Sequence, residues 1–197
     1  MTAYRAWLCD LDGTLYHPHL LKLLMGLELI VLGLPELRTI RTFRKEHERL
    51  RHQRSQNPFE EQIERTAQRL KLPHERVQQS AERWMIERPL RWLPRFRRES
   101  LFREIVEFRS RGGLTAVVSD YPATRKLEAL DLARHFDVVV ASGESGGPSA
   151  LKPAPDGYLK AALSLGVSPE HCLVIGDRDD ADGAAARAAG MAFRLIA

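Results

Sequence analysis

The stretch that decides the fold is Ala6-Trp7-Leu8-Cys9-Asp10-Leu11-Asp12-Gly13-Thr14. Its first four residues are apolar and predict a short buried strand, and the glycine predicts a sharp turn directly after it. Strand side chains alternate between two faces, so Asp10 and Asp12 share one side, and the turn lets both carboxylates meet one ligand. Two acids this close repel each other unless they share a proton or a hard divalent cation such as Mg²⁺. The alternative is a plain surface turn, because Asp-Gly is a common turn dipeptide.

From Arg95 onward, the sequence alternates between apolar runs and helical patterns. Four apolar runs predict strands at 114–118, 138–140, 172–175 and 193–196. Before and between these runs, apolar residues recur at the spacing of amphipathic helices. Gly112-Gly113 closes the first of these helices, just ahead of the run at 114–118. Continuous β-branched runs that alternate with helices are typical of a parallel sheet. The sequence therefore predicts an α/β fold, a Rossmann-like parallel sheet with helices on both faces.

The residues between Thr14 and Arg95 have helical patterns and no strand pattern. Helices are predicted at 18–33, 36–54, 59–71 and 74–88, separated by breaks at Pro35, Asn57-Pro58, Pro73 and Pro89. Proline fixes φ and disfavours a helical residue before it, so each of these positions predicts a helix end. The leucine-rich residues 20–34 are about fifteen in number, which is too short to span a bilayer. They predict a buried or interfacial helix.

Polar side chains follow the predicted strands at the edge where parallel sheets bind ligands. Ser119 follows the second strand and precedes a helix that begins near Pro122, where its hydroxyl and nearby N–H groups could grip a phosphate. A plain helix cap is the alternative for this serine. Lys152 lies in Leu151-Lys152-Pro153-Ala154-Pro155, whose prolines hold the loop rigid; a fixed ammonium there suits a phosphoryl anion, whereas a solvated lysine is the alternative.

The segment Gly176-Asp177-Arg178-Asp179-Asp180-Ala181-Asp182 places four carboxylates within six residues after a buried strand. Such a concentration of like charge is costly unless a cation binds there, so the segment predicts a metal site. The alternative is an acidic cluster that interacts with the positive end of a helix dipole, and this explains one or two acids better than four.

These motifs, in this order, resemble those of the haloacid dehalogenase-like (HAD) phosphohydrolase superfamily. The resemblance implies that Asp10 is the nucleophile, that Asp12 is the general acid/base, and that Ser119 and Lys152 bind the transferring phosphoryl group. It also implies a Mg²⁺ site, with ligands assigned to Asp10, Asp12, Asp177 and Asp182. In related proteins the second acid of the last motif follows the first by four or five positions. Four positions after Asp177 is Ala181, so Asp182 is the expected partner, and Asp179 and Asp180 are expected to be loop residues.

The resemblance also implies a division of the chain. Residues 1–16 and 95–197 correspond to a HAD-like α/β core, and residues 17–94 to the helical cap that one subgroup inserts between the first and second motifs. One departure concerns Asp120, because the family often has asparagine after the motif serine. The arginine-rich run 38–54 is expected to be a solvated helix face. The histidines are expected to be solvated or in the core, although His17 and His19, just past the acidic pair, are candidates to touch substrate.

The implied function is a Mg²⁺-dependent phosphatase that cleaves a small phosphorylated metabolite through an aspartyl-phosphate intermediate. A phosphomutase or other phosphotransferase stays open, because its core residues would be the same. Dehalogenase chemistry is disfavoured by Asp12, which the resemblance associates with phosphoryl transfer. A further alternative is an interaction protein that docks partners on its basic cap. The identity of the substrate is left open.

Composition places further bounds on the chain. A formal net charge of +4 and 44% apolar residues are typical of a globular protein. Cys9 and Cys172 each lie in an apolar run, which indicates buried thiols and a reducing compartment. No signal peptide or transmembrane segment is recognised, so a cytoplasmic location is expected. No nucleic-acid-binding signature is present, so no nucleic-acid partner is expected, and the oligomeric state is left open.

Overall fold

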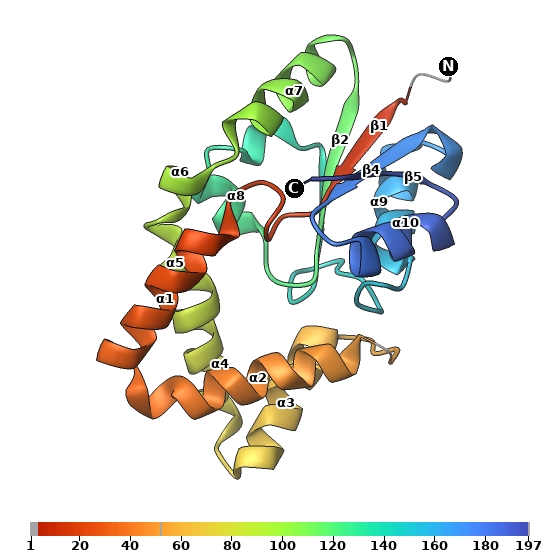
Figure 1. Ribbon diagram of the computed structural model, residues 1–197. Helices are drawn as coiled ribbons and strands as arrows, with labels where there is room; N and C mark the ends of the chain where they lie inside the picture. The colour runs from red at the N-terminus through yellow and green to blue at the C-terminus, as the bar shows by residue number, and fades with distance from the viewer. Residues whose placement is uncertain (1–3, 52, 197) are drawn as a thin grey trace.

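The computed structural model describes residues 4–51 and 53–196. In this part of the chain, five strands form one parallel sheet in the order β3-β2-β1-β4-β5 (Figure 1). Their bounds are Ala6–Cys9 (β1), Leu114–Ser119 (β2), Val138–Ala141 (β3), Cys172–Gly176 (β4) and Ala192–Leu195 (β5). The central strand is β1, where Leu8 lies opposite Ala116 of β2 and Val174 of β4. The predicted parallel sheet is confirmed.

Helices cover both faces of this sheet, because its strands carry apolar side chains on both sides. The helices are Glu99–Ser110 (α7), Thr124–Ala129 (α8), Asp156–Leu165 (α9) and Ala184–Ala188 (α10), and the short helical turns are Leu93–Phe96 (α6), Ala133–His135 (η3), Pro169–His171 (η4) and Asp179–Gly183 (η5). Ile105 of α7 packs in the cluster that contains Cys9, and Ala161 of α9 packs in the cluster that contains Leu8. Figure 1 shows α7 and α8 on one side of the sheet, with α9 and α10 on the other.

The remaining helices form what we call the helical block, residues 18–90, beyond the carboxyl ends of the central strands (Figure 1). Its elements are Pro18–Leu32 (α1), Leu34–Glu36 (η1), Leu37–Leu50 (α2), Pro58–Leu70 (α3), His74–Ala81 (α4), Glu82–Glu87 (η2) and Arg88–Leu90 (α5). Phe43, Ile63 and Val77 belong to a small core of its own. Asn57 caps α3 by accepting the N–H of Glu60 at 3.3 Å, as its place before a proline predicts.

Two helix ends differ from the sequence prediction. The helix predicted at 36–54 ends at Leu50, and Arg54 instead pairs with Ala150 in an isolated bridge. The helix end predicted at Pro89 is displaced by two residues, because the path stays helical from α4 through η2 into α5 and ends at Leu90. The turn at η2 is of the wide π type, and the N–H of Arg88 bonds to the carbonyl of Arg83. A widened turn changes the bonding pattern ahead of the proline, which lets the chain continue without a break.

The leucine-rich helix α1 is less buried than predicted. Large apolar side chains of α1 and η1 that are exposed include Leu20, Leu23, Leu27, Ile30, Val31, Leu32 and Leu34. Only one side of α1 is packed, so of the two predicted alternatives, a buried or an interfacial helix, a fully buried helix is wrong. Among the described residues, no helix is both long and apolar enough to cross a membrane.

Candidate active site

Asp10 and Asp12 lie directly beyond the carboxyl end of β1. Asp10 is buried, and its carboxylate accepts a hydrogen bond of 2.9 Å from the Thr14 hydroxyl. The turn depends on Gly13, which has a φ of +113°. A Cβ at this position would also lie 2.1 Å from a carboxylate oxygen of Asp177, so only glycine fits. The strand-then-glycine pattern thus brings two acidic segments, far apart in the sequence, into contact.

Lys152 reaches into the same place from the loop before α9. Its ammonium lies 2.5 Å from Asp10 and 2.8 Å from Asp182. Burial alone would lower the pKa of Lys152, but the two carboxylates raise it well above its ordinary value. The lysine is therefore a fixed positive charge in contact with the Asp10 carboxylate.

The acidic segment after β4 divides into two inner and two outer residues. Asp177 and Asp182 each offer a carboxylate oxygen within 4.8 Å of one on Asp10. Asp182 is held in place by the Tyr158 hydroxyl, which donates to it at 2.8 Å. Asp179 and Asp180 instead lie on the surface, where they pair with Arg187 and Arg178. The geometry separates these four acids in the way that the spacing predicts, with the inner pair beside Asp10.

Three carboxylates share this site with one ammonium, which leaves an excess of negative charge. Burial raises the pKa of Asp10, with a further contribution from Asp182, and the same two causes raise the pKa of Asp177. An all-oxygen donor set with excess negative charge fits a hard divalent cation. The site residues thus fit a hard divalent cation, and Asp10, Asp177 and Asp182 are the carboxylates that lie close enough together to hold one.

The carboxylate of Asp12 does not belong to this group. It accepts hydrogen bonds from Lys126 of α8 at 2.7 and 2.8 Å and from the Tyr16 hydroxyl at 2.6 Å. Burial alone would raise the pKa of Asp12, but the Lys126 ammonium and these hydrogen bonds hold it below its ordinary value. The side chain predicted as a metal ligand is therefore turned toward a lysine instead.

Ser119 lines the same cavity as Asp10, Asp12 and Lys152, which has a volume of about 290 Å³. It lies at the end of β2, almost fully buried, and its oxygen accepts the N–H of Tyr121 at 3.2 Å. The four residues predicted as catalytic or phosphate-binding are thus brought together around one space, although Ser119 is also used within its own turn.

Asp120 connects the sheet edge to the helical block. One of its oxygens accepts the N–H of Lys152 at 3.1 Å, and the other lies 3.7 Å from His47 Nε2 and 3.5 Å from Arg51. Burial alone would raise the pKa of Asp120, but His47 and Lys152 hold it below its ordinary value. An aspartate at this position, where the resemblance implies asparagine, thus places a partly buried charge opposite α2.

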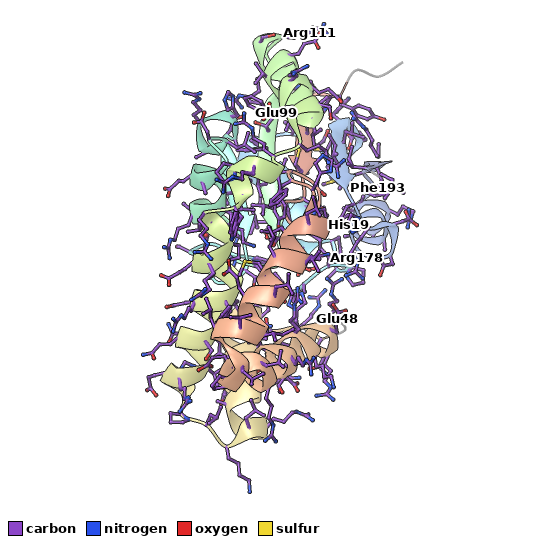
Figure 2. All side chains as sticks on the ribbon, turned by 60° about the vertical axis from the view of Figure 1, so that its left-hand side comes forward. His19, Glu48, Glu99, Arg111, Arg178 and Phe193 are labelled. Atoms are coloured by element: carbon purple, nitrogen blue, oxygen red, sulfur yellow. The ribbon has the colours of Figure 1, made fainter. Side chains whose placement is uncertain are left out.

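The run 38–54 is not a solvated face throughout, which corrects the sequence prediction. Arg44, His47 and Arg51 line the cavity, and the His47 ring stacks on Tyr121 with ring centroids 4.4 Å apart. A second link joins Glu48 to Arg178 at 4.0 Å, and Figure 2 shows these two side chains near each other. The position of His47 on the apolar face of its helix was the one sign in the sequence that this run is not wholly solvated.

Other residues at the site were missed or misplaced by the sequence patterns. Thr14, Tyr16, Lys126 and Tyr158 each bond a site carboxylate, yet none belongs to a motif that spacing alone would select. His17 and His19, which were candidates to touch substrate, are exposed and do not line this cavity. Figure 2 shows His19 near the start of α1.

Comparison with known proteins identifies this arrangement. Residues 4–190 match the family model described as haloacid dehalogenase-like hydrolase. The chain belongs to this family. Phosphoserine phosphatase of Thermus thermophilus is 33% identical over 138 residues, which cover 68% of this chain and 53% of that protein. Phosphoglycolate phosphatase of Escherichia coli is 41% identical over 64 residues, or 32% of this chain and 24% of that protein.

Solved structures of the HAD-like family share the whole fold. β-Phosphoglucomutase from Clostridium difficile superposes with a TM-score of 0.66 at 18% identity, over 98% of this chain and 85% of that one. At this identity the likeness shows the fold alone. The chain spans about half the length of the phosphoserine phosphatase, 53%, and about a quarter of the phosphoglycolate phosphatase, 24%.

Proposed function

We propose that the protein hydrolyses phosphate monoesters at Asp10. The observation that carries this proposal is the buried Asp10 carboxylate, 2.5 Å from Lys152, at the head of a cavity that Asp12 also lines. A carboxylate beside a fixed cation can approach an anionic phosphate that would otherwise repel it. The phosphatases among the relatives named above support the same class of reaction.

In the first step, Asp10 forms a bond to phosphorus while the bond from phosphorus to the alcohol oxygen breaks. Asp12 gives the leaving oxygen its proton. In the second step, the oxygen of a water molecule bonds to phosphorus, Asp12 takes one proton of that water, and the bond between phosphorus and Asp10 breaks, which restores the Asp10 carboxylate and frees inorganic phosphate. Lys152 and Ser119 hold the phosphoryl oxygens throughout.

Lys126 has a direct bearing on these proton transfers. Before phosphate binds, Lys126 stabilises the charged form of Asp12, which is the form that accepts a proton from water. A dianionic phosphate beside Asp10 adds negative charge that opposes Lys126, and this raises the pKa of Asp12 toward the range of a proton donor.

We propose Mg²⁺ as the cation, held by Asp10, Asp177 and Asp182. When bound, it neutralises charge on the phosphate and on these carboxylates. We also propose that residues 1–16 and 95–197 act as the catalytic core and residues 17–94 as a cap. The contacts of His47, Arg51 and Glu48 with the core support this division, because they place cap side chains beside the cavity. A lid over the site excludes water and selects the substrate.

The test measures phosphate release from phenyl phosphate by the purified protein, with Mg²⁺ and after complete removal of divalent metal. We expect release with Mg²⁺, loss of release on chelation, and recovery on adding Mg²⁺ back. Full activity without divalent metal would contradict the metal assignment. Transfer of the phosphoryl group to a second alcohol, with no free phosphate, would instead favour a phosphomutase.

A further inference from the structure

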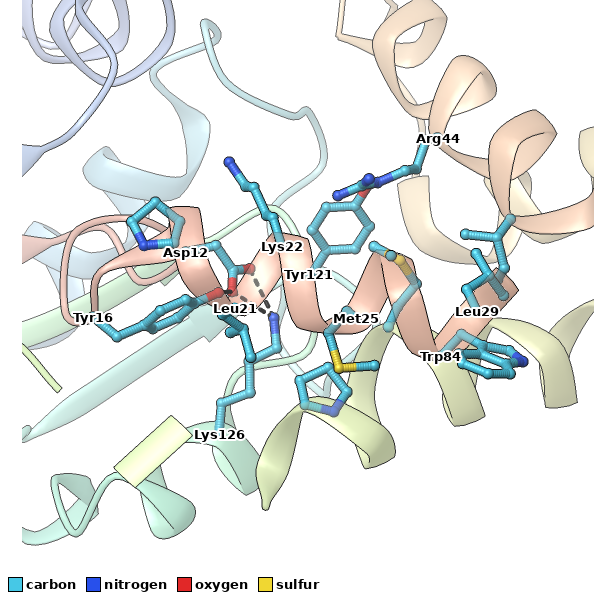
Figure 3. A pocket seen from close by; sticks show the side chains of 15 residues that line it. Asp12, Tyr16, Leu21, Lys22, Met25, Leu29, Arg44, Trp84, Tyr121 and Lys126 are labelled. Atoms are coloured by element: carbon cyan, nitrogen blue, oxygen red, sulfur yellow. Dashed lines mark hydrogen bonds and ion pairs between the residues drawn. The ribbon is translucent and has the colours of Figure 1, made fainter. Parts of the chain in front are cut away.

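A second cavity, of about 190 Å³, adjoins the proposed phosphate site. It lies between the helical block and the core, and four residues line both cavities: Asp12, Lys22, Arg44 and Tyr121. Figure 3 shows Asp12, Tyr16 and Lys126 at one end of it and Leu29 and Trp84 at the other. The second cavity is therefore placed next to the carboxylate that would meet the leaving alcohol.

Apart from its charged end, this cavity is apolar. The side chains of Leu21, Met25, Leu29, Ile40, Trp84 and Met85 line it. Lys22, Arg44 and Lys126 are the lysine and arginine residues that line it, and Lys126 is already bonded to Asp12. A small polar alcohol at the charged end would leave the apolar part unfilled, whereas a carbon chain or ring would fill it. A volume of this size holds several non-hydrogen atoms.

Gly26 adds an independent observation. It lies in the interior of α1, where glycine is a poor helix former, and it lines the second cavity. Its φ is not positive, so the backbone does not require glycine there. A Cβ at Gly26 would meet nothing within 4 Å, so close packing does not require glycine either. Any side chain at this position would take up space that the cavity now has.

We infer that the substrate is a phosphate monoester of an apolar alcohol, an alkyl, prenyl or aryl phosphate whose carbon chain or ring occupies the second cavity. This inference rests on the proposed function, because it places the phosphate of the same molecule at Asp10. Each methylene moved from water into an apolar site is worth about fourfold in affinity. The cavity therefore selects by chain length, while the phosphate site provides the reaction.

The first experiment compares methyl, butyl, hexyl and phenyl phosphate with phosphoserine and phosphoglycolate, by phosphate release in the presence of Mg²⁺. We expect kcat/KM to rise about fourfold per methylene from methyl to hexyl phosphate, and kcat/KM for hexyl phosphate to exceed that for phosphoserine and phosphoglycolate by at least tenfold. Preference for either polar ester would overturn the inference and leave the proposed function standing. No release from any ester would overturn the proposed function.

The second experiment uses Gly26→Leu to fill the cavity, with Gly26→Ala as the matched control. Both changes favour the helix and neither Cβ meets a clash, so folding is expected to persist and is checked by thermal unfolding. We expect Gly26→Leu to lower kcat/KM at least tenfold for hexyl phosphate and less than twofold for methyl phosphate. Gly26→Ala should change the ratio of kcat/KM for hexyl phosphate to kcat/KM for methyl phosphate by less than threefold. An unchanged ratio in Gly26→Leu would overturn the inference.

A third measurement separates the second cavity from the exposed side of the same helix. Leu27, next to Gly26, is exposed, so Leu27→Gln leaves the cavity lining intact. Calorimetric titration with hexylphosphonate and methylphosphonate, which are not hydrolysed, measures binding directly. In wild type and in Leu27→Gln, we expect hexylphosphonate to bind at least tenfold more tightly than methylphosphonate. In Gly26→Leu, we expect this difference in affinity to disappear. Loss of the advantage in Leu27→Gln alone would place the chain on the outer surface and overturn the inference.

Discussion

The carboxyl edge of the sheet and the inner side of the helical block differ in how they are built. At the edge, Asp10 and Asp182 each have a charged or hydrogen-bonding partner at short range, Lys152 for Asp10 and Tyr158 for Asp182. On the inner side of the block, the second cavity is lined mainly by apolar side chains around Gly26. This difference supports the division of labour that we propose, in which the edge of the sheet binds the phosphate and the second cavity binds the alcohol part of the substrate.

Charged contacts join the core to the helical block, among them the pair of Arg125 and Glu87 at 3.4 Å and the contacts of two residues at the edge of the sheet. Asp120 faces His47 and Arg51, and Arg178 faces Glu48. These contacts join side chains of a strand end and a loop to one helix, α2. The comparison therefore predicts that changes at the edge affect all substrates, that changes on the inner side affect selectivity, and that changes at the junction affect how the two are held together.

The largest effect is expected at Asp10. The change Asp10→Asn removes the nucleophile and should lower kcat by about 10⁴-fold or more, equally for methyl and hexyl phosphate. Phosphate release at saturating substrate measures it, with Asp179→Asn as the control because Asp179 is exposed and paired with Arg187. Retention of a tenth of the activity would place the nucleophile elsewhere.

The next effect concerns the cation. Neutralising Asp177 or Asp182 to asparagine should raise the Mg²⁺ concentration for half-maximal activity by about tenfold or more, because each lies in the group of three carboxylates. Asp179→Asn should leave it within twofold. A titration of activity against Mg²⁺ checks all three variants. If Asp179→Asn were the most damaging and Asp182→Asn neutral, the assignment of the inner pair would be wrong.

A smaller effect is expected at the junction. The change Asp120→Asn keeps an acceptor for the Lys152 N–H but removes the charge opposite His47 and Arg51. We expect the free energy of unfolding to fall by about 1–2 kcal/mol, because the partly buried Arg51 guanidinium loses the Asp120 carboxylate as its partner. Chemical denaturation measures this loss. An unchanged or higher free energy of unfolding would show that the Asp120 carboxylate is not stabilised by His47 and Arg51.

The smallest effect is expected at the exposed link between the same regions. Glu48→Gln removes the pairing with Arg178 at 4.0 Å and a second pairing with Arg51 at 3.3 Å, and the Glu48 side chain is 60% exposed. Such surface pairs are worth little, so the free energy of unfolding should change by less than about 0.5 kcal/mol. The same denaturation experiment compares it with Asp120→Asn. A larger loss in Glu48→Gln would reverse the assignment of which contact holds the helical block to the core.

Much of the fold and part of the site follow from local patterns. The stretch from Ala6 to Gly13 predicts a strand, a turn and two acids at its end, because burial, alternation and the freedom of glycine act over a few residues. The run that precedes Asp177 predicts the same arrangement at β4. The carboxyl ends of parallel strands lie at the same edge of a sheet. Local patterns are therefore enough to predict that the two acidic segments approach each other.

Only the tertiary structure decided what lies opposite these acids. Lys126 pairs with Asp12 across 114 positions of the sequence, and His47 approaches Asp120 from another helix. The cavity beside Gly26 depends on the angle at which α1 packs against η2 and the core. Periodicity tells which side of a helix is apolar, but the partner of that side depends on contacts between residues distant in sequence. The sequence by itself thus determined the acids at the strand ends, and packing alone decided their partners and the space left for a substrate.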